Sequence, residues 1–331
     1  MLGECKMAEQ VLREAINKVE VVGIAQESTL ELKVYNDKVT GAPYNAIKGE
    51  VTVKINEDET QVVSYFTKEL TKKGEVSKNF KSLTTIMSEM VTVADVAQGL
   101  SEGEPSRIEC SGKLSLNEFK ASDGNVVSFT QISGEYSPKR FKGEASDFKP
   151  KAEFNVEGIV KALTQETDKD GVETGRLKIQ LYVPIYGGKI IPLTFVTSET
   201  LPQGGKDYLT DNFVPRASVR VKGVLVNKSK KIERVIEAGF GENIVETTYE
   251  RSREFIAVSG VLYEEGVDKE VFDVSLLGEA VALRNRHLSS LKEKETDSKP
   301  QQEGFGSASQ QNVAPKPQVK NEDLDDLFGE D

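Results

Sequence analysis

The alternation of hydrophobic and polar positions is clearest between residues 153 and 227, where it predicts a small β-barrel. The run RLKIQLYV (176–183) alternates strictly, so that Leu177, Ile179, Leu181 and Val183 share one side of a strand. A glycine at 223 marks a sharp bend or bulge in the last strand of this interval. The pattern predicts four strands, at 154–164, 176–183, 189–196 and 218–226, with one short helix inside 201–214.

The first half of the chain carries similar signals. Helical spacing predicts an amphipathic helix at 7–19 that caps the first domain, and a second helix at 82–98 that begins at Ser82 and stops at Gly99. The turn at 122–124 joins the last two strands of this half. Strand-like alternation occurs at 19–35, 46–55, 60–70, 107–116 and 126–136.

The predicted order is three strands, a helix and two further strands. This is the order of the OB-fold, a five-stranded Greek-key barrel that binds oligonucleotides and oligosaccharides. Glycine-containing landmarks recur in both halves in the same order, which indicates a duplicated barrel. The three pairs are 21–24 with 156–159, 112–114 with 223–225, and 132–134 with 258–260.

The predicted fold is therefore mainly β, with two tandem OB-fold-like five-stranded barrels, short helices and a disordered acidic C-terminal tail. In the second half a long loop or hairpin is expected to contain 228–234 and 239–243, followed by an additional hairpin at 260–277 and a helix at 278–294. The predicted divisions are a first domain at 1–148, a second at 149–294, a disordered linker at 295–318 and an acidic interaction tail at 319–331.

The net charge of −11 argues against a nucleic-acid partner, so its distribution along the chain has to be examined. Residues 319–331 hold −5 and residues 295–318 hold −1, which leaves −5 for residues 1–294. Any nucleic-acid surface must then be a local groove. No apolar run approaches a membrane span and no signal-peptide core is present, which predicts a cytoplasmic protein.

Residues that could carry catalysis or bind a metal are sparse. Cys5 and Cys110 lack metal-ligand spacing, and the single histidine, His287, is predicted to be a surface residue on the polar C-terminal helix. Asp168 and Asp170 precede a glycine without the rest of a calcium loop, so a hairpin turn is the better interpretation. We therefore predict no metal, no cofactor and no enzymatic activity.

A row of cations and aromatics on the polar sides of the strands indicates a nucleic-acid interface, because such surfaces follow a phosphate backbone and stack bases. For each of these residues alone, a solvated face is the simpler interpretation. The DNA-binding candidates are Arg176, Lys178, Tyr182, Tyr186, Lys189, Arg220 and Lys222 in the second barrel, with Lys48, Lys54, Tyr65, Lys68, Lys72 and Lys73 in the first.

Two barrels at 17–263 and a Pro/Gln/Gly/Ser linker ending in DLDDLFGED make the chain similar to single-stranded DNA-binding proteins of bacteria and, more closely, of bacteriophages. The resemblance implies binding of single-stranded DNA in replication, recombination and repair, in the host cytoplasm if the protein is phage-encoded. It also implies an acidic tail that recruits replication or recombination proteins and competes with DNA. The partner-binding candidates are the acids Asp323, Asp325 and Asp326 and the apolar Leu324, Leu327 and Phe328.

The tail departs from the bacterial pattern, which ends in Pro-Phe with a free carboxylate. Here Phe328 is followed by Gly329, Glu330 and Asp331, so a pocket that recognises a terminal phenylalanine would not fit it. Two alternatives remain open: a structural or virion protein built from two β-domains, and an oligosaccharide-binding or metal-dependent enzyme. The sequence leaves open the oligomeric state, the preference for DNA or RNA, and the identity of tail partners.

Overall fold

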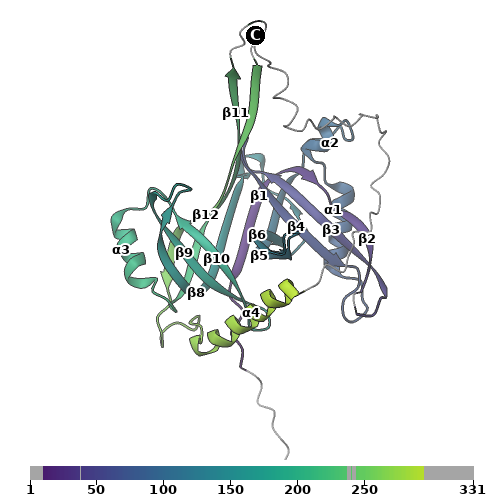
Figure 1. The fold of residues 1–331 in the computed structure, drawn as a ribbon. Coiled ribbons are helices and arrows are strands. Elements are labelled where there is room, and N and C mark those ends of the chain that lie inside the picture. The colour runs from purple at the N-terminus through teal and green to yellow at the C-terminus, as the bar shows by residue number, and fades with distance from the viewer. Residues whose placement is uncertain (1–9, 38, 237–239, 241–243, 294–331) are drawn as a thin grey trace, which may run out of the picture. The chain divides into compact units, whose positions relative to one another are not determined.

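A computed structural model describes residues 10–293 except 38, 237–239 and 241–243. These residues form a mainly β structure with a few short helices, which confirms the predicted fold class (Figure 1). None of the helices in the described ranges is both long and apolar enough to span a bilayer.

Five strands of the first half close into a ring in the order β1-β3-β4-β6-β5-β1. The β4–β6 pairing is parallel and the others are antiparallel, and the helical segment lies between β4 and β5 in the sequence. This is the OB-fold topology. The elements are β1 (Asn17–Ser28), β2 (Glu31–Asn36), β3 (Pro43–Lys54), β4 (Thr60–Lys68), α1 (Lys78–Glu89), α2 (Val93–Ala97), β5 (Arg107–Lys120), β6 (Val126–Gly134) and β7 (Lys139–Arg140).

The second half closes an equivalent ring, β8-β9-β10-β12-β11-β8, again with one parallel pairing, between β10 and β12. α3 lies between β10 and β11 in the sequence, at the position that the helical segment has in the first barrel. The elements are β8 (Lys151–Thr167), β9 (Glu173–Ile185), β10 (Lys189–Thr197), α3 (Gln203–Asn212), β11 (Ser218–Ile236), β12 (Ile244–Leu262) and α4 (Leu277–Glu293), with 3₁₀ turns at Ala145–Asp147 and Val274–Leu276.

The first strands of the two barrels pair with each other, so a single sheet runs through both rings. β1 and β8 are antiparallel, and Val19 lies opposite Phe154. These two residues are 135 positions apart, as are the landmark glycines Gly23 and Gly158. The pairing therefore places a local pseudo-two-fold axis at Val19 and Phe154. The domain boundary at 148/149 stays a prediction.

Glycine is required where the first strand of the first barrel bends. A Cβ on Gly23 would lie 2.3 Å from the carbonyl oxygen of Lys54, far inside van der Waals contact. Gly23 lies where β1 passes from pairing with β8, which ends at Val22, to pairing with β3, which begins at Ile24. The register of β1 against β3 also shifts, between Ala25 and Glu27. The bend lets one strand take part in closing the ring.

The predicted capping helix at 7–19 is wrong over its described part. Residues 10–16 are not helical and β1 begins at Asn17. Leu12 and Ala15 are buried, and the Ala15 amide donates to the carbonyl of Pro184 in β9 at 3.0 Å. Apolar residues spaced by three resemble the buried stripe of a helix, but here they belong to a non-helical segment that packs on the second barrel.

The helix predicted at 82–98 is two helices. α1 begins at Lys78 and ends at Glu89, so Ser82 lies inside it and is not its N-cap. Thr92 starts α2 through a capping box with Asp95, in which each backbone amide donates to the other residue's side chain. The apolar stripe continues across the break because both helices pack on the same barrel.

The hairpin expected within 228–243 is confirmed, since β11 and β12 pair from Val219 with Leu262 to Ile236 with Ile244. It extends beyond the second barrel (Figure 1). Its lower part touches the β3–β4 turn, where the Ser229 amide donates to the carbonyl of Asp58 at 2.9 Å. The additional hairpin at 260–277 is wrong, because β12 ends at Leu262 and turns lead into α4, which matches the helix predicted at 278–294.

Candidate nucleic-acid interface

Three aromatic side chains meet on the outside of the first barrel and are called here the outer aromatic face. They are Tyr35 of β2, Tyr44 of β3 and Phe66 of β4. The rings of Tyr35 and Tyr44 stack at 5.9 Å, and Phe66 meets Tyr35 edge-on at 5.9 Å. Phe66 is 52% exposed although it is apolar. The second and third ring strands that carry Tyr44 and Phe66 are those whose outer surface binds oligonucleotides in OB-folds.

Lysines surround this face. The Lys68 ammonium lies 4.0 Å from the ring centroid of Tyr44, and Lys48 stands directly opposite Phe66 in the β3–β4 pair. Lys33 also belongs to this side of β2 but forms an ion pair with Glu31 at 2.5 Å. Lys48 and Lys68 are both exposed. Cations beside stacked rings are the combination that single-stranded nucleic acid requires.

A second aromatic pair continues the surface along the β5–β6 arm. Phe119 and Phe129 are 45% and 41% exposed, and their rings meet edge-on at 6.3 Å. A groove lined by Phe66, Asn117 and Gln131, among others, lies between the outer aromatic face and this pair. Asparagine and glutamine amides in such a groove can donate to and accept from base edges.

The corresponding face of the second barrel is more polar. Lys178 and Tyr182 are half-buried on β9, and the Lys161 ammonium lies 5.6 Å from the Tyr182 ring centroid. Tyr186 is 85% exposed but stands in the turn after β9, not on the strand surface. No cluster of exposed rings comparable to the outer aromatic face occurs among the described residues of this barrel.

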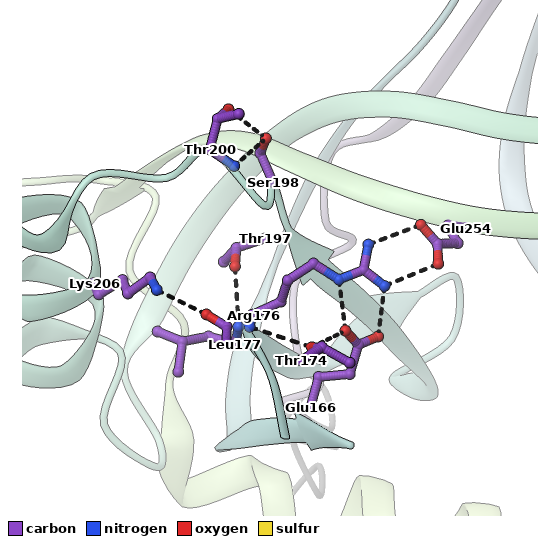
Figure 2. Close-up of polar contacts among 10 residues, drawn as sticks. Glu166, Thr174, Arg176, Leu177, Thr197, Ser198, Thr200, Lys206 and Glu254 are labelled. Carbon is purple, nitrogen blue, oxygen red and sulfur yellow. Dashed lines mark hydrogen bonds and ion pairs between the residues drawn. The ribbon is translucent and has the colours of Figure 1, made fainter. Parts of the chain in front are cut away.

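The predicted exposure of Arg176 is wrong. Its side chain is buried between two carboxylates: Nη1 and Nη2 donate to Glu254 at 2.9 Å each, and Nη2 and Nε donate to Glu166 at 2.9 and 2.5 Å (Figure 2). The carboxylates hold the pKa of Arg176 above its usual range. Four donors are thus occupied in joining β8, β9 and the lower part of the β11–β12 hairpin, which leaves this guanidinium no face for phosphate.

The predicted exposure of Tyr65 is also wrong. It is only 2% exposed and points into the first barrel, where its ring fills the space beside Gly134. Burial raises the pKa of the neighbouring Cys110 thiol to about 12, so this cysteine is a neutral core residue. Cys5 lies outside the described residues.

The other sequence candidates differ in their surroundings. Lys54 forms an ion pair with Glu57 at 2.8 Å, and the Arg220 Nε donates to Asn155 Oδ1 at 2.7 Å. The acidic tail candidates at 323–328 lie outside the described residues. The exposed lysines are Lys48, Lys68, Lys72, Lys73, Lys189 and Lys222, and their roles in DNA binding stay predictions.

Sequence reasoning missed Tyr35, Tyr44 and Phe66. The signal that could have found Phe66 is alternation in β4: Gln61, Val63 and Tyr65 point inward, so Phe66 must point outward. Tyr35 and Tyr44 could not be brought together without knowing that β2 folds back on β3 and pairs them.

The described residues contain no group of three or more histidine, cysteine or acidic side chains arranged to hold a metal ion. His287 is 54% exposed and its Nε2 lies 3.4 Å from a carboxylate oxygen of Glu118, which confirms its surface position.

Solved structures similar to this chain include the wild-type single-stranded DNA binding protein from Thermus aquaticus, with a TM-score of 0.40 and 11% identity over 78% of this chain and 97% of that chain. A deletion mutant of the same protein gives 0.40 and 11% over 78% and 98%. A replication protein A heterotrimer bound to ssDNA gives 0.19 and 10% over 88% and 56%. No curated protein matches. The YorF family model, in contrast, matches residues 15–314, which is most of the sequence, and the chain therefore belongs to the YorF family.

Proposed function

We propose that this protein binds single-stranded DNA without sequence preference, through the outer aromatic face of the first barrel. The observation that carries the proposal is the contact of Tyr35 with both Tyr44 and Phe66 on the outer strand surface, with Lys48 and Lys68 beside them. An exposed aromatic cluster is costly in water unless a ligand covers it, and every base offers a ring face that can stack on it.

The acidic net charge is compatible with this proposal because the cations are local. Phosphate neutralisation depends on lysines within reach of the strand, since surface charges farther than about 10 Å are screened at 0.1 M salt. Binding is therefore expected to weaken as salt rises, with a log-log slope of about −0.7 per phosphate contacted on a single strand.

The test is a fluorescence titration with oligo(dT) at two salt concentrations. Phe66→Ala and Tyr35→Ala should each weaken binding by about 1–3 kcal/mol, the contribution of a stacked base. Leu32→Ala is the matched control, because Leu32 is 56% exposed on the same strand as Tyr35 but points to the other side. It should leave affinity unchanged.

A double variant, Lys48→Glu with Lys68→Glu, tests the electrostatic part. It should lower affinity and make the salt slope shallower, because fewer phosphates are neutralised. Wild-type affinity in all these variants would refute the proposed interface. Wild-type protein that shows no salt-dependent binding to oligo(dT) would favour a structural role instead.

We also infer a role in replication or recombination, with residues 319–331 recruiting a partner protein. The support is the sequence of that segment, which combines a dense acidic run with Leu324, Leu327 and Phe328. Apolar residues spaced within acids suit a partner surface that has both a basic rim and an apolar pocket.

A further inference from the structure

A second groove crosses the junction between the two barrels, on the sheet formed by β5, β1, β8, β11 and β12. Lys18 of β1 lies opposite Asn155 of β8, which lies opposite Lys222 of β11, which lies opposite Ser259 of β12. Residues directly opposite in a sheet point to the same side. The four therefore form one polar row across four strands, and all of them line the groove.

The row is cationic and its charges are available. Neither Lys18 nor Lys222 forms an ion pair with any residue in the described ranges, and the same holds for Lys139, which lines the groove from β7. The Arg220 Nε donates to Asn155 Oδ1, so the N–H groups of the Asn155 amide remain as donors. Three ammonium groups and an amide thus converge from both barrels.

The carboxylates of the groove are partly neutralised. Glu20 and Glu153 face each other in the next row, and both are bound by Lys151, at 3.2 and 2.9 Å. Glu135 also lines the groove and has no such partner among the described residues. The local charge is therefore a net +1 although the chain as a whole is acidic, because four lysines stand against three carboxylates: Lys18, Lys139, Lys151 and Lys222 against Glu20, Glu135 and Glu153.

The pseudo-two-fold relation between the barrels does not extend to these side chains. At an offset of 135 residues, Lys18 corresponds to Glu153 and Asn155 corresponds to Glu20. One side of the axis therefore carries a lysine and an amide where the other carries two carboxylates. Folding of a duplicated barrel does not require either of these two differences, because Lys18, Glu20, Glu153 and Asn155 are all at least partly exposed.

The junction groove adjoins the groove beside the outer aromatic face. Ser133 and Gly134 line the latter, and the next two residues, Glu135 and Tyr136, line the former. Tyr136 is 57% exposed. A strand leaving the face near Phe66 can therefore pass over residues 133–136 and enter the junction groove beside an exposed aromatic ring.

We propose that the junction groove binds the phosphodiester backbone of single-stranded DNA that continues from the outer aromatic face, with Lys18, Lys139 and Lys222 neutralising phosphates. This inference rests on the proposed function and adds a second contact region to it. It gives the junction between the barrels a role of its own, since neither barrel alone supplies the row.

The test compares two lengths of oligo(dT), because one OB-fold covers about 4–16 nucleotides. The triple variant Lys18→Glu, Lys139→Glu, Lys222→Glu should weaken binding of an oligonucleotide of about 30 nucleotides at least tenfold and make its salt slope shallower. Binding of about 8 nucleotides should change less than twofold. The matched control reverses three exposed lysines elsewhere, Lys81, Lys169 and Lys269, and should change neither affinity by more than about twofold.

The corresponding Lys→Gln triple variant keeps the test decisive if the reversals impair folding. It should reduce long-oligonucleotide affinity by a smaller factor with an unchanged thermal midpoint. If both triple variants bind the long oligonucleotide like wild type while Phe66→Ala weakens both lengths, the junction groove is refuted and the proposed function stands. If Phe66→Ala, Tyr35→Ala and the Lys48→Glu, Lys68→Glu variant all leave both lengths unaffected, the proposed interface fails first.

Discussion

Tyr65 and Phe66 are consecutive residues of β4 that lie on opposite sides of the first barrel wall, one 2% exposed inside it and the other 52% exposed outside it. Their substitutions should therefore separate stability from binding. Tyr65→Ala empties a core position and should lower the free energy of unfolding by about 3–5 kcal/mol, as loss of a large buried ring does. Phe66→Ala should change it by less than about 1 kcal/mol while weakening oligo(dT) binding.

Denaturant unfolding and fluorescence titration of the same two variants provide the measurement. Tyr65→Phe is the control for the hydroxyl, and it should retain most of the stability because the ring still fills the space beside Gly134. A Phe66→Ala protein as unstable as Tyr65→Ala would show that Phe66 is a packing residue and would remove the outer aromatic face from consideration.

Arg176 should prove to be structural. Removing its guanidinium in Arg176→Ala leaves Glu166 and Glu254 without the ion pairs that join them, so the variant should lose up to about 3–5 kcal/mol of stability. Lys178→Ala, two residues along the same strand, should lose less than about 1 kcal/mol. We expect folded Arg176→Ala to bind oligo(dT) within twofold of wild type in the same titration, and a tenfold loss without a change in thermal midpoint would restore Arg176 as a DNA contact.

The strand order was predictable because it depends on local alternation, which β9 and β4 display plainly. The exposure of individual polar side chains could not be predicted, because it depends on partners that are distant in the sequence. Arg176 alternates with the core residues like any outward residue, yet Glu254, 78 positions away, closes over it. Tyr35 and Tyr44 likewise meet only through the β2–β3 pairing.

The N-terminal segment shows the same limit. Leu12 and Ala15 have the spacing of a helix, and their environment is decided by Pro184 and Glu157 in the other barrel. Periodicity describes which residues are buried but not whether a helix or an extended segment buries them. The pairing of β1 with β8 could not be predicted from the sequence either, because each strand could have closed its own ring without it.

Glu157 should make stability sensitive to acid. It is fully buried, and although burial alone raises the pKa of a carboxyl, the hydrogen bonds from the Ile16 amide, the Tyr263 hydroxyl and Arg13 outweigh it and lower the pKa of Glu157 below its ordinary 4.5. The unfolded chain then binds more protons near that value. The stabilisation is complete above about pH 4.5 and is lost as pH falls through the folded pKa.

The measurement is the free energy of unfolding between pH 3 and pH 7. Glu157→Gln should be less stable at pH 7, because one amide cannot accept all three hydrogen bonds, and should lose less stability on acidification than wild type. Glu153→Gln, an exposed acid on the same strand, should follow the wild-type profile. Parallel acid profiles for wild type and Glu157→Gln would exclude Glu157 as the source of the pH dependence.

The acidic segment 319–331 should oppose DNA binding through its charge. It contributes −5, so its deletion changes the formal net charge from −11 to −6 and removes repulsion between the protein and a polyanion. Deletion should therefore tighten oligo(dT) binding at low salt, with a gain that shrinks as salt screens the interaction. A full-length variant with its six acids replaced by the matching amides should reproduce the gain, since charge and not length is responsible.

The apolar residues of the segment should have a separate effect. Replacing Leu324, Leu327 and Phe328 with Ala leaves the charge intact, so oligo(dT) affinity should stay within twofold of wild type while capture of a replication or recombination protein is lost. Pull-down of the partner and titration with oligo(dT) distinguish the two effects when both are performed on the wild type, the 319–331 deletion and the triple-alanine variant. Equal low-salt affinity in the deletion and the wild type would refute the electrostatic part, and a triple-alanine segment that still captures the partner would refute the docking part.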